Sequence, residues 1–207
     1  MRRWLLAALV AAFPLSTPAE SRGFTAGDLA TLARISEPEL SPDGRQVVFT
    51  LRETDLAADR GRTDLWLRNV DGDSTLHRLT SSEENDAAAD WAPDGKGIYF
   101  LSSRSGSPQV WYLAISGGEA TQVTQLPLDV AGFRISPRGD RLAVAIEAFP
   151  DCADLECTRK RLDERKAEKQ RGQAYDQLFV RHWDKWKDGR VSQLFSIAID
   201  RDQRATG

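Results

Sequence analysis

A short pattern ending in Pro-x-Gly occurs three times in this chain and constrains the fold more than any other feature. The copies are Leu40-Ser41-Pro42-Asp43-Gly44, Trp91-Ala92-Pro93-Asp94-Gly95 and Ile135-Ser136-Pro137-Arg138-Gly139. The equivalent positions Asp43, Asp94 and Arg138 are separated by 51 and 44 residues. A period in this range is typical of stacked or radial repeats, because one such unit cannot bury its own apolar face.

Each copy has the chemistry of a tight turn that leads into a strand. Proline pre-sets φ for the first central position of a β-turn, and glycine accepts the positive φ of a sharp reversal. Aspartate can also cap such a turn through its own side chain. We expect the third turn, with Arg138 in that position, to keep its shape and to lose the cap. The apolar runs that follow the turns are Val47-Val48-Phe49, Ile98-Tyr99-Phe100 and Leu142-Ala143-Val144.

Further strands follow in each repeat. Runs rich in β-branched and aromatic residues are typical of strands in a packed sheet, and they occupy residues 65–71, 110–116 and 194–200. A Gly-containing turn then leads to shorter segments at 76–80 and 120–124. With the strand before each Pro-x-Gly turn, the repeat contains four strands, which is the blade of a β-propeller. Hairpins of a β-sandwich are the alternative, but they do not predict an aromatic residue at each of Trp66, Trp111 and Phe195.

We therefore predict an all-β fold, a partial β-propeller of about three four-stranded blades with a helical insertion in blade three. Blade one is assigned to residues 37–82, blade two to 87–127 and blade three to 130–207, with the insertion at 150–190. The acidic cluster Glu83-Glu84-Asn85-Asp86 falls in a loop between blades, where we expect solvation.

The N-terminus has the layout of a secretory signal peptide. Two arginines precede an apolar run, residues 4–13, that is too short to span a bilayer comfortably, and small residues follow up to Ala19. We predict a signal peptide at 1–19, a lead-in segment at 20–36, and export to the periplasm or medium. Without a lipobox cysteine no membrane anchor is expected. The formal net charge of −3 gives no support to nucleic-acid binding.

The insertion contains both cysteines and a charged run. The run, residues 158–172, is rich in strong helix formers and predicts a short solvated helix. In an exported protein, Cys152 and Cys157 favour a local disulfide. A metal site is the weaker alternative, because the two histidines, His77 and His182, have no zinc-ligand spacing to the cysteines. We predict no metal and no cofactor.

Aromatic and charged groups are concentrated in residues 175–189 as nowhere else. Such a segment can line a cavity in which Asp184 or Asp188 attracts a peptide amine and Arg181 a carboxylate, and His182 is a further candidate contact. These four residues are the candidate substrate contacts. In the alternative interpretation, the tryptophans cover a blade face and the charges fix the insertion to it.

Three features together resemble one family: the Ser-Pro-Asp-Gly turns, the lead-in Phe24-Thr25-Ala26-Gly27-Asp28-Leu29, and the stretch Arg181-His182-Trp183-Asp184-Lys185-Trp186. The chain resembles the N-terminal propeller of exported bacterial serine peptidases of the prolyl oligopeptidase family, on its dipeptidyl peptidase and acylaminoacyl peptidase side. The resemblance implies a C-terminal α/β-hydrolase domain with a Ser-Asp-His triad, and a propeller that gates the access of peptides to it.

This chain itself contains no Gly-x-Ser-x-Gly nucleophile elbow, so no catalytic residue is assigned. The nearest sequence, Ser105-Gly106-Ser107, falls in a predicted loop between strands. We therefore expect a portion of a longer reading frame. The alternative function is a non-enzymatic periplasmic scaffold that resembles the Tol-system propeller protein. That protein places an α/β domain before its blades, whereas here the first blade follows the signal peptide almost directly.

Overall fold

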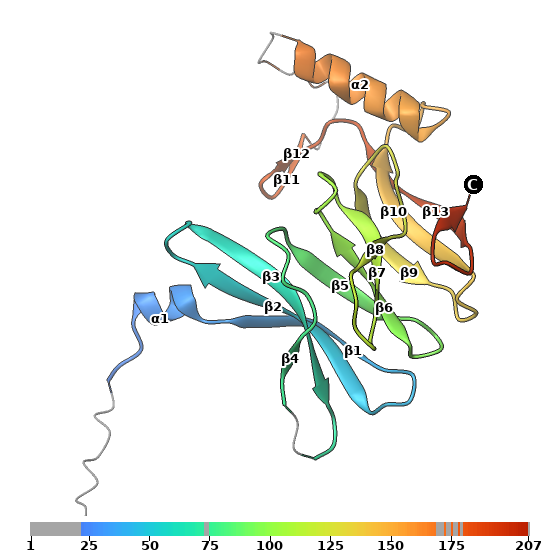
Figure 1. Ribbon diagram of the computed structural model, residues 1–207. Helices are drawn as coiled ribbons and strands as arrows, with labels where there is room; N and C mark the ends of the chain where they lie inside the picture. Colours follow the sequence, from blue (N-terminus) through green and yellow to red (C-terminus); the bar gives the residue numbers. More distant parts are fainter. Residues whose placement is uncertain are drawn as a thin grey trace, which may run out of the picture.

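The computed structural model describes residues 22–72, 75–168, 172, 175, 178 and 180–206. Its main feature is a set of three four-stranded antiparallel sheets, shown side by side in Figure 1. The predicted signal peptide lies outside the described residues. Within these described ranges, no helix has the length and apolar character needed to cross a membrane.

Each sheet is built from strands that are paired in the order β1-β2-β3-β4, β5-β6-β7-β8 and β9-β10-β13-β14. The first contains β1 (Arg34–Leu40), β2 (Gln46–Asp55), β3 (Arg60–Asn69) and β4 (His77–Arg78). The second contains β5 (Asp86–Trp91), β6 (Gly97–Ser102), β7 (Gln109–Ala114) and β8 (Thr121–Gln122). The third contains β9 (Val130–Ile135), β10 (Arg141–Ala148), β13 (Val191–Ile199) and β14 (Ala205–Thr206).

The sheets are arranged radially. Strand β5 packs against β1 on one side and contacts β9 on the other, so the first strands of the three sheets are neighbours. From these first strands each sheet continues outward to its short fourth strand (Figure 1). The predicted all-β fold, a partial β-propeller of about three four-stranded blades, is confirmed.

The repeated turn has the same backbone in all three sheets. Gly44, Gly95 and Gly139 have φ values of 71°, 70° and 71°, and each donates its N–H to the carbonyl three residues earlier at 2.8 Å. In the first turn, Asp43 accepts hydrogen bonds from the Ser41 hydroxyl at 2.6 Å and from a backbone N–H.

The expectation that the third turn loses its cap is wrong. Asp140, two residues after Arg138, accepts a hydrogen bond from the Ser136 hydroxyl at 2.8 Å. The guanidinium of Arg138 also lies 2.9 Å from the Asp140 carboxylate. The cap has moved along the chain, because an aspartate on either side of the glycine can reach the serine at the start of the turn.

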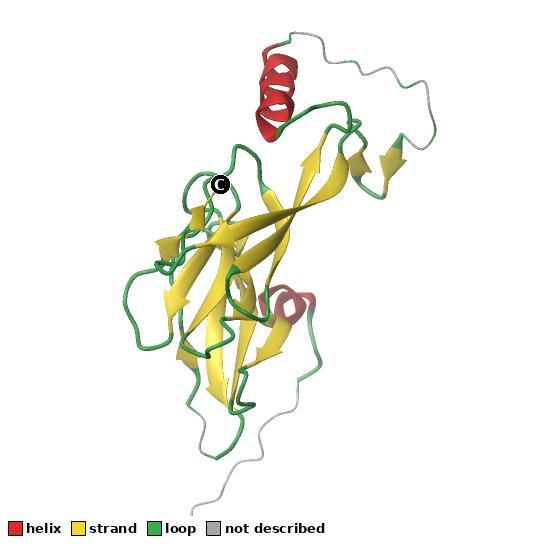
Figure 2. Cartoon of the chain, turned by 90° about the vertical axis from the view of Figure 1, so that its right-hand side faces the viewer, coloured by secondary structure: helices red, strands yellow, loops and turns green. Residues whose placement is uncertain are grey.

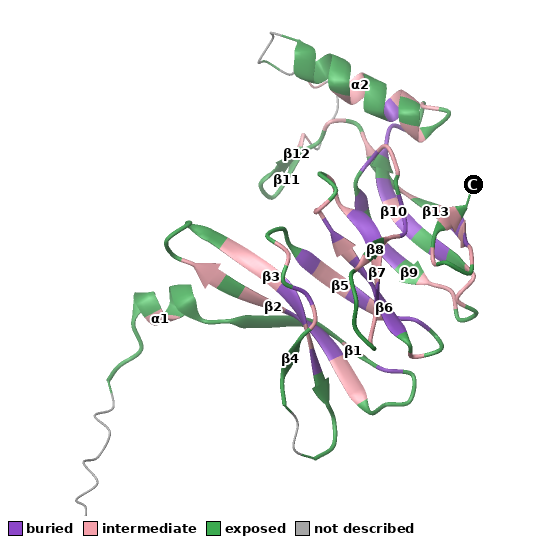
Figure 3. Cartoon of the chain, viewed as in Figure 1, coloured by how far each residue is buried: buried purple, intermediate pink, exposed green. Residues whose placement is uncertain are grey.

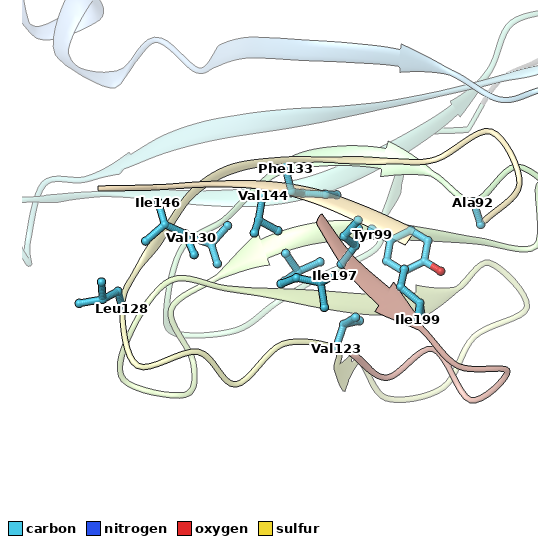
Figure 4. Packing of buried hydrophobic residues seen from close by; sticks show 12 residues of the cluster. Ala92, Tyr99, Val123, Leu128, Val130, Phe133, Val144, Ile146, Ile197 and Ile199 are labelled. Carbon is cyan, nitrogen blue, oxygen red and sulfur yellow. The ribbon is translucent and has the colours of Figure 1, made fainter. Parts of the chain in front are cut away.

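The apolar core lies between the sheets rather than within them. One cluster joins the first and second sheets and includes Leu65 and Phe100, both fully buried. The other joins the second and third sheets and includes Tyr99, Val144 and Ile197, which converge in Figure 4. Figure 3 shows the same pattern, with the buried residues concentrated in the strands. Fully burying one such side chain contributes about 1.5–3 kcal/mol, so each sheet depends on its neighbour for stability.

Two helices flank the sheets. The lead-in forms α1 (Ala26–Thr31), which begins with a capping box between Thr25 and Asp28. Hydrogen bonds from Arg22 and Thr25 hold the pKa of Asp28 well below its ordinary value. The second helix, α2 (Leu155–Ala167), belongs to the insertion between β10 and β13 and lies beyond the end of the third sheet (Figure 2). It begins three residues before the predicted charged run, because Asp154 caps its N-terminus.

Candidate functional site

The candidate residues of the insertion lie on a small hairpin. Strand β11 (Arg181–His182) pairs with β12 (Lys185–Trp186) in antiparallel register, and two residues form the turn. The hairpin lies at the end of the third sheet that also carries α2 (Figures 1 and 2). Its described side chains are all exposed, as the colouring in Figure 3 shows. The structure thus brings Arg181, His182 and Asp184 together in one exposed element.

The indole of Trp186 organises this hairpin. The Arg181 guanidinium carbon lies 5.4 Å from the centre of the Trp186 ring, a cation–π contact across the paired strands. The ring of Tyr175 stacks on the same indole, with centroids 6.0 Å apart and planes at 26°. The contact holds the Arg181 guanidinium beside the indole, and guanidinium N–H groups are the donors that bind a carboxylate.

The tip of the hairpin presents a large aromatic side chain to solvent. Trp183 is 84% exposed and has a φ of 52°, in the left-handed region that side-chain-bearing residues rarely adopt. The His182 ring meets the Trp183 indole edge-on, with centroids 6.4 Å apart. Together with Arg181 and Asp184, these two residues line an open depression. A cation, an anion and two aromatic rings therefore surround one hollow.

Asp188 occupies a different position. Its carboxylate accepts hydrogen bonds from the Arg190 side chain at 2.7 Å and from the Arg190 backbone N–H at 3.1 Å. Its carbonyl accepts a hydrogen bond from Arg165 of α2 at 2.8 Å. Asp188 thus connects the base of the hairpin to the helix, whereas the other three candidates lie nearer the tip.

The two cysteines lie just before and within the first turn of α2. The structure joins Cys152 and Cys157 by a disulfide, with the two Cα atoms 5.5 Å apart. Within the described part of the chain, no three His, Cys, Asp or Glu side chains gather in a group that could hold a metal ion.

The acidic loop between the first and second sheets differs from the sequence expectation. Glu83 and Glu84 are exposed, as expected, but Asp86 is fully buried. Its carboxylate lies 2.7 Å from Arg104, whose guanidinium also stacks over the Trp111 ring at 5.0 Å. The expected solvation of Asp86 is wrong because a buried charge needs a partner, and the loop between β6 and β7 supplies one.

Sequence reasoning also missed a charged cluster on the first strands of the sheets. Arg134 of β9 lies 3.3 Å from Glu39 of β1 and 3.7 Å from Asp90 of β5. Glu37 of β1 accepts a hydrogen bond from the backbone N–H of Ala88 in β5 at 2.9 Å. These contacts tie three sheets together near their common centre. The signal in the sequence was the presence of charged residues in each strand that precedes a Pro-x-Gly turn.

Comparison with known proteins places the repeated sheets in a family. A family model described as the TolB beta propeller domain (PD40) matches residues 30–166. The chain is 28% identical over 202 residues to dipeptidyl-peptidase 5 of Porphyromonas endodontalis, an alignment that covers 90% of this chain and 28% of the relative. The chain therefore spans just over a quarter of the length of that relative.

Solved structures show the same fold at low identity. Pyrococcus horikoshii acylaminoacyl peptidase matches with a TM-score of 0.58 and 14% identity, over 86% of this chain and 25% of that chain. The isopeptidase AtxE2 matches with a TM-score of 0.59 and 21% identity, over 86% of this chain and 31% of that chain. The resemblance to the propeller region of peptidases, inferred from the sequence, is confirmed. With the family model covering well over half of its residues, the chain belongs to the TolB beta propeller domain family.

Proposed function

We propose that this chain is the propeller portion of an exported serine peptidase of the prolyl oligopeptidase family, in which it gates peptide access to an α/β-hydrolase domain elsewhere in the longer protein. The observation that carries the proposal is the hairpin β11–β12, which presents Arg181, His182 and Asp184 around one hollow. A chain similar to a dipeptidyl peptidase has a use for a surface that recognises the charged ends of short peptides.

The chemistry of the hairpin suits a short peptide. Arg181, in cation–π contact with Trp186, would bind a terminal carboxylate, and Asp184 would bind an ammonium group. The exposed indole of Trp183 would cover an apolar side chain between the two charged ends. Asp188 is already paired with Arg190, so we assign amine recognition to Asp184. No catalytic step is assigned to these residues, because catalysis would belong to the hydrolase domain.

Binding assays with end-blocked peptides test this proposal. We expect the chain to bind a short peptide with free ends, and Arg181→Ala to weaken binding of the free acid by about 10-fold or more, since a hydrogen bond to a charged group contributes about 1.5–3 kcal/mol. The corresponding peptide amide should bind equally to both proteins. Asp184→Asn should discriminate in the same way between a free and an acetylated N-terminus. Equal affinity for acid and amide in the unmodified chain would contradict the assignment of Arg181.

The chain alone is expected to hydrolyse no dipeptidyl or acylaminoacyl chromogenic substrate, because these 207 residues contain no Gly-x-Ser-x-Gly elbow. Hydrolysis that a serine-directed inhibitor abolishes would contradict the proposal that catalysis belongs to the hydrolase domain. The longer coding sequence is expected to contain the elbow, and translating it is the simplest check.

A second candidate function is supported by the family description itself. The matching family model is described by the name TolB and not by a peptidase, so a periplasmic interaction scaffold is the competing proposal. A scaffold would bind a folded protein rather than a short peptide, and its longer coding sequence would contain no nucleophile elbow. Peptide-binding assays and translation of the longer coding sequence therefore separate the peptidase from the scaffold.

A further inference from the structure

The side chain of Phe149 joins the third sheet to the insertion. Phe149 directly follows β10 and is only 3% exposed, although it lies beyond the end of the strand. The guanidinium groups of Arg161 and Arg165 lie 4.5 Å and 4.7 Å from the centre of its ring. These arginines are four residues apart on α2 and so share one face of the helix. The helix thus holds the aromatic ring through two cation–π contacts.

The start of α2 is fixed to the same region of the chain. The Cys152–Cys157 disulfide closes the loop that leads into the helix. The fully buried Thr158 hydroxyl accepts a hydrogen bond from the Phe149 backbone N–H at 3.2 Å. Arg161 donates two hydrogen bonds to Asp151, at 2.9 Å and 2.8 Å. These contacts leave α2 little freedom to rotate relative to the end of β10.

The base of the hairpin rests on this assembly. Arg165 donates a hydrogen bond to the Asp188 carbonyl at 2.8 Å. Gly189 has a φ of 93°, and a Cβ atom at this position would lie 3.5 Å from the Phe149 ring. Residues 188–190 therefore run directly beside the clamped ring before β13 begins. We name Phe149, Arg161, Arg165 and the disulfide together the Phe149 clamp.

The hairpin needs such an anchor. It contains only two cross-strand pairs, and an isolated two-stranded hairpin is marginally stable at best in water. Among the described residues, the contacts that fix its position are the stack of Tyr175 on Trp186 and those at its base. Whatever holds the base therefore determines whether Arg181 and Asp184 keep a defined geometry.

We propose that the Phe149 clamp positions the β11–β12 hairpin, with Arg165 as a positioning residue and the disulfide as the element that keeps the clamp closed. The position of the hairpin follows from the contacts alone. Its consequence for peptide recognition rests on the function proposed above.

Amide hydrogen exchange in the full chain tests the clamp. Mass spectrometry under non-reducing conditions should first show a two-hydrogen deficit in the peptide that contains both cysteines. We then expect Arg165→Ala, and separately the double variant Cys152→Ser/Cys157→Ser, to accelerate exchange of the hairpin amides 181–187 by at least 10-fold, while amides of β6 keep their rates. Arg159→Ala is the matched control, because Arg159 lies on the same helix and its ion-pair partners among the described residues are Glu156 and Asp163.

Unchanged hairpin exchange in folded Arg165→Ala would overturn the proposal, as would equal acceleration in the Arg159 control or two freely alkylatable thiols in the oxidised protein. If circular dichroism shows that Arg165→Ala does not fold, hairpin exchange is measured in Arg165→Lys instead. Lysine keeps the charge and a donor but lacks the planar face, so intermediate exchange is expected, and a wild-type rate would count against the clamp.

Peptide binding separates this inference from the proposed function. If the clamp positions the recognition site, Arg165→Ala should lose affinity for the free-acid peptide although Arg181 is intact, and Arg165→Lys should restore part of it. If the unmodified chain binds no peptide while hairpin exchange still responds to Arg165→Ala, the clamp stands and the proposed function falls. If the peptide binds but hairpin exchange does not respond to Arg165→Ala, the proposed function stands and the clamp falls.

Discussion

Leu65 and Leu194 occupy aligned positions in the first and third sheets, and their surroundings differ completely. Leu65 is fully buried against the second sheet, whereas Leu194 is 81% exposed. Val110, the equivalent residue of the second sheet, is fully buried against the third. The residue type and the strand are similar in each case, so the neighbouring sheet determines burial. Properties that depend on a neighbour should therefore differ between sheets, and properties of a single turn should not.

The largest expected contrast is in core stability. Leu65→Ala should lower the free energy of unfolding by about 2–5 kcal/mol, because it removes buried methyl groups and leaves a cavity. Leu194→Ala should change it by less than about 0.5 kcal/mol, as is usual for exposed positions. Urea denaturation followed by tryptophan fluorescence measures both. A cost above about 2 kcal/mol for Leu194→Ala would show that another surface covers this residue in solution.

The next contrast concerns a hydrogen bond repeated in the first two sheets. The fully buried Thr124 hydroxyl accepts from the Val110 backbone N–H at 2.9 Å and donates to the Gln109 side chain at 2.8 Å. Thr80 makes the same bond to the Leu65 N–H at 3.0 Å. Thr124→Val would leave a buried N–H without a partner, which costs about 1–3 kcal/mol.

The third sheet supplies the control for that experiment. Thr206 is exposed, and its hydroxyl reaches only the Ala198 carbonyl at 3.5 Å. Thr206→Val should therefore leave the urea midpoint almost unchanged. If both substitutions cost the same, the shared threonine reflects strand preference, and the buried hydrogen bond contributes nothing measurable.

Sequence reasoning recovered the features that are encoded locally. Proline, aspartate and glycine at fixed spacing specify a turn, and the apolar run after it specifies a strand, so the four-stranded repeat could be read without a structure. The prediction that Arg181, His182, Asp184 and Asp188 contact the substrate also came from a local signal, the concentration of aromatic and charged groups in residues 175–189, and it stays a prediction.

Contacts between distant segments could not be read in this way. Asp86 finds its partner Arg104 in the loop after the neighbouring strand β6, and Arg134 meets Glu39 from a strand 95 residues earlier. The Phe149 clamp depends on which face of α2 meets the sheet, and composition does not specify that face. Each of these contacts depends on how segments pack against one another in three dimensions, which a single sequence leaves undetermined.

The Pro-x-Gly turn should contribute equally to stability in the first sheet, where Leu65 is buried, and in the third sheet, where Leu194 is exposed. Gly44→Ala and Gly139→Ala each force a side chain into the left-handed region, at a cost of about 1–2 kcal/mol. The backbone around both glycines has room for a methyl group, so the conformational term should dominate. Equal shifts in the urea midpoint are expected. A much larger cost in the first sheet would mean that the turn also depends on its neighbour. Gly132→Ala, in β9 with open space around it and a non-positive φ, is the control.

The smallest expected effect is a pH dependence shared by the two turn caps. The Ser41 hydroxyl and the Arg45 N–H lower the pKa of Asp43, and Ser136 and Arg138 lower that of Asp140. A carboxyl whose pKa is lower in the folded state contributes stability above its unfolded pKa, near 3.9, and loses it as the pH falls through the folded value. Asp43→Asn and Asp140→Asn should therefore lower the urea midpoint slightly at pH 7 and not at about pH 2. A difference between variant and parent that persists undiminished at the acidic pH would assign the caps a role independent of charge. A pH-dependent difference for only one of the two would show that the displaced cap of the third turn is not equivalent to the first.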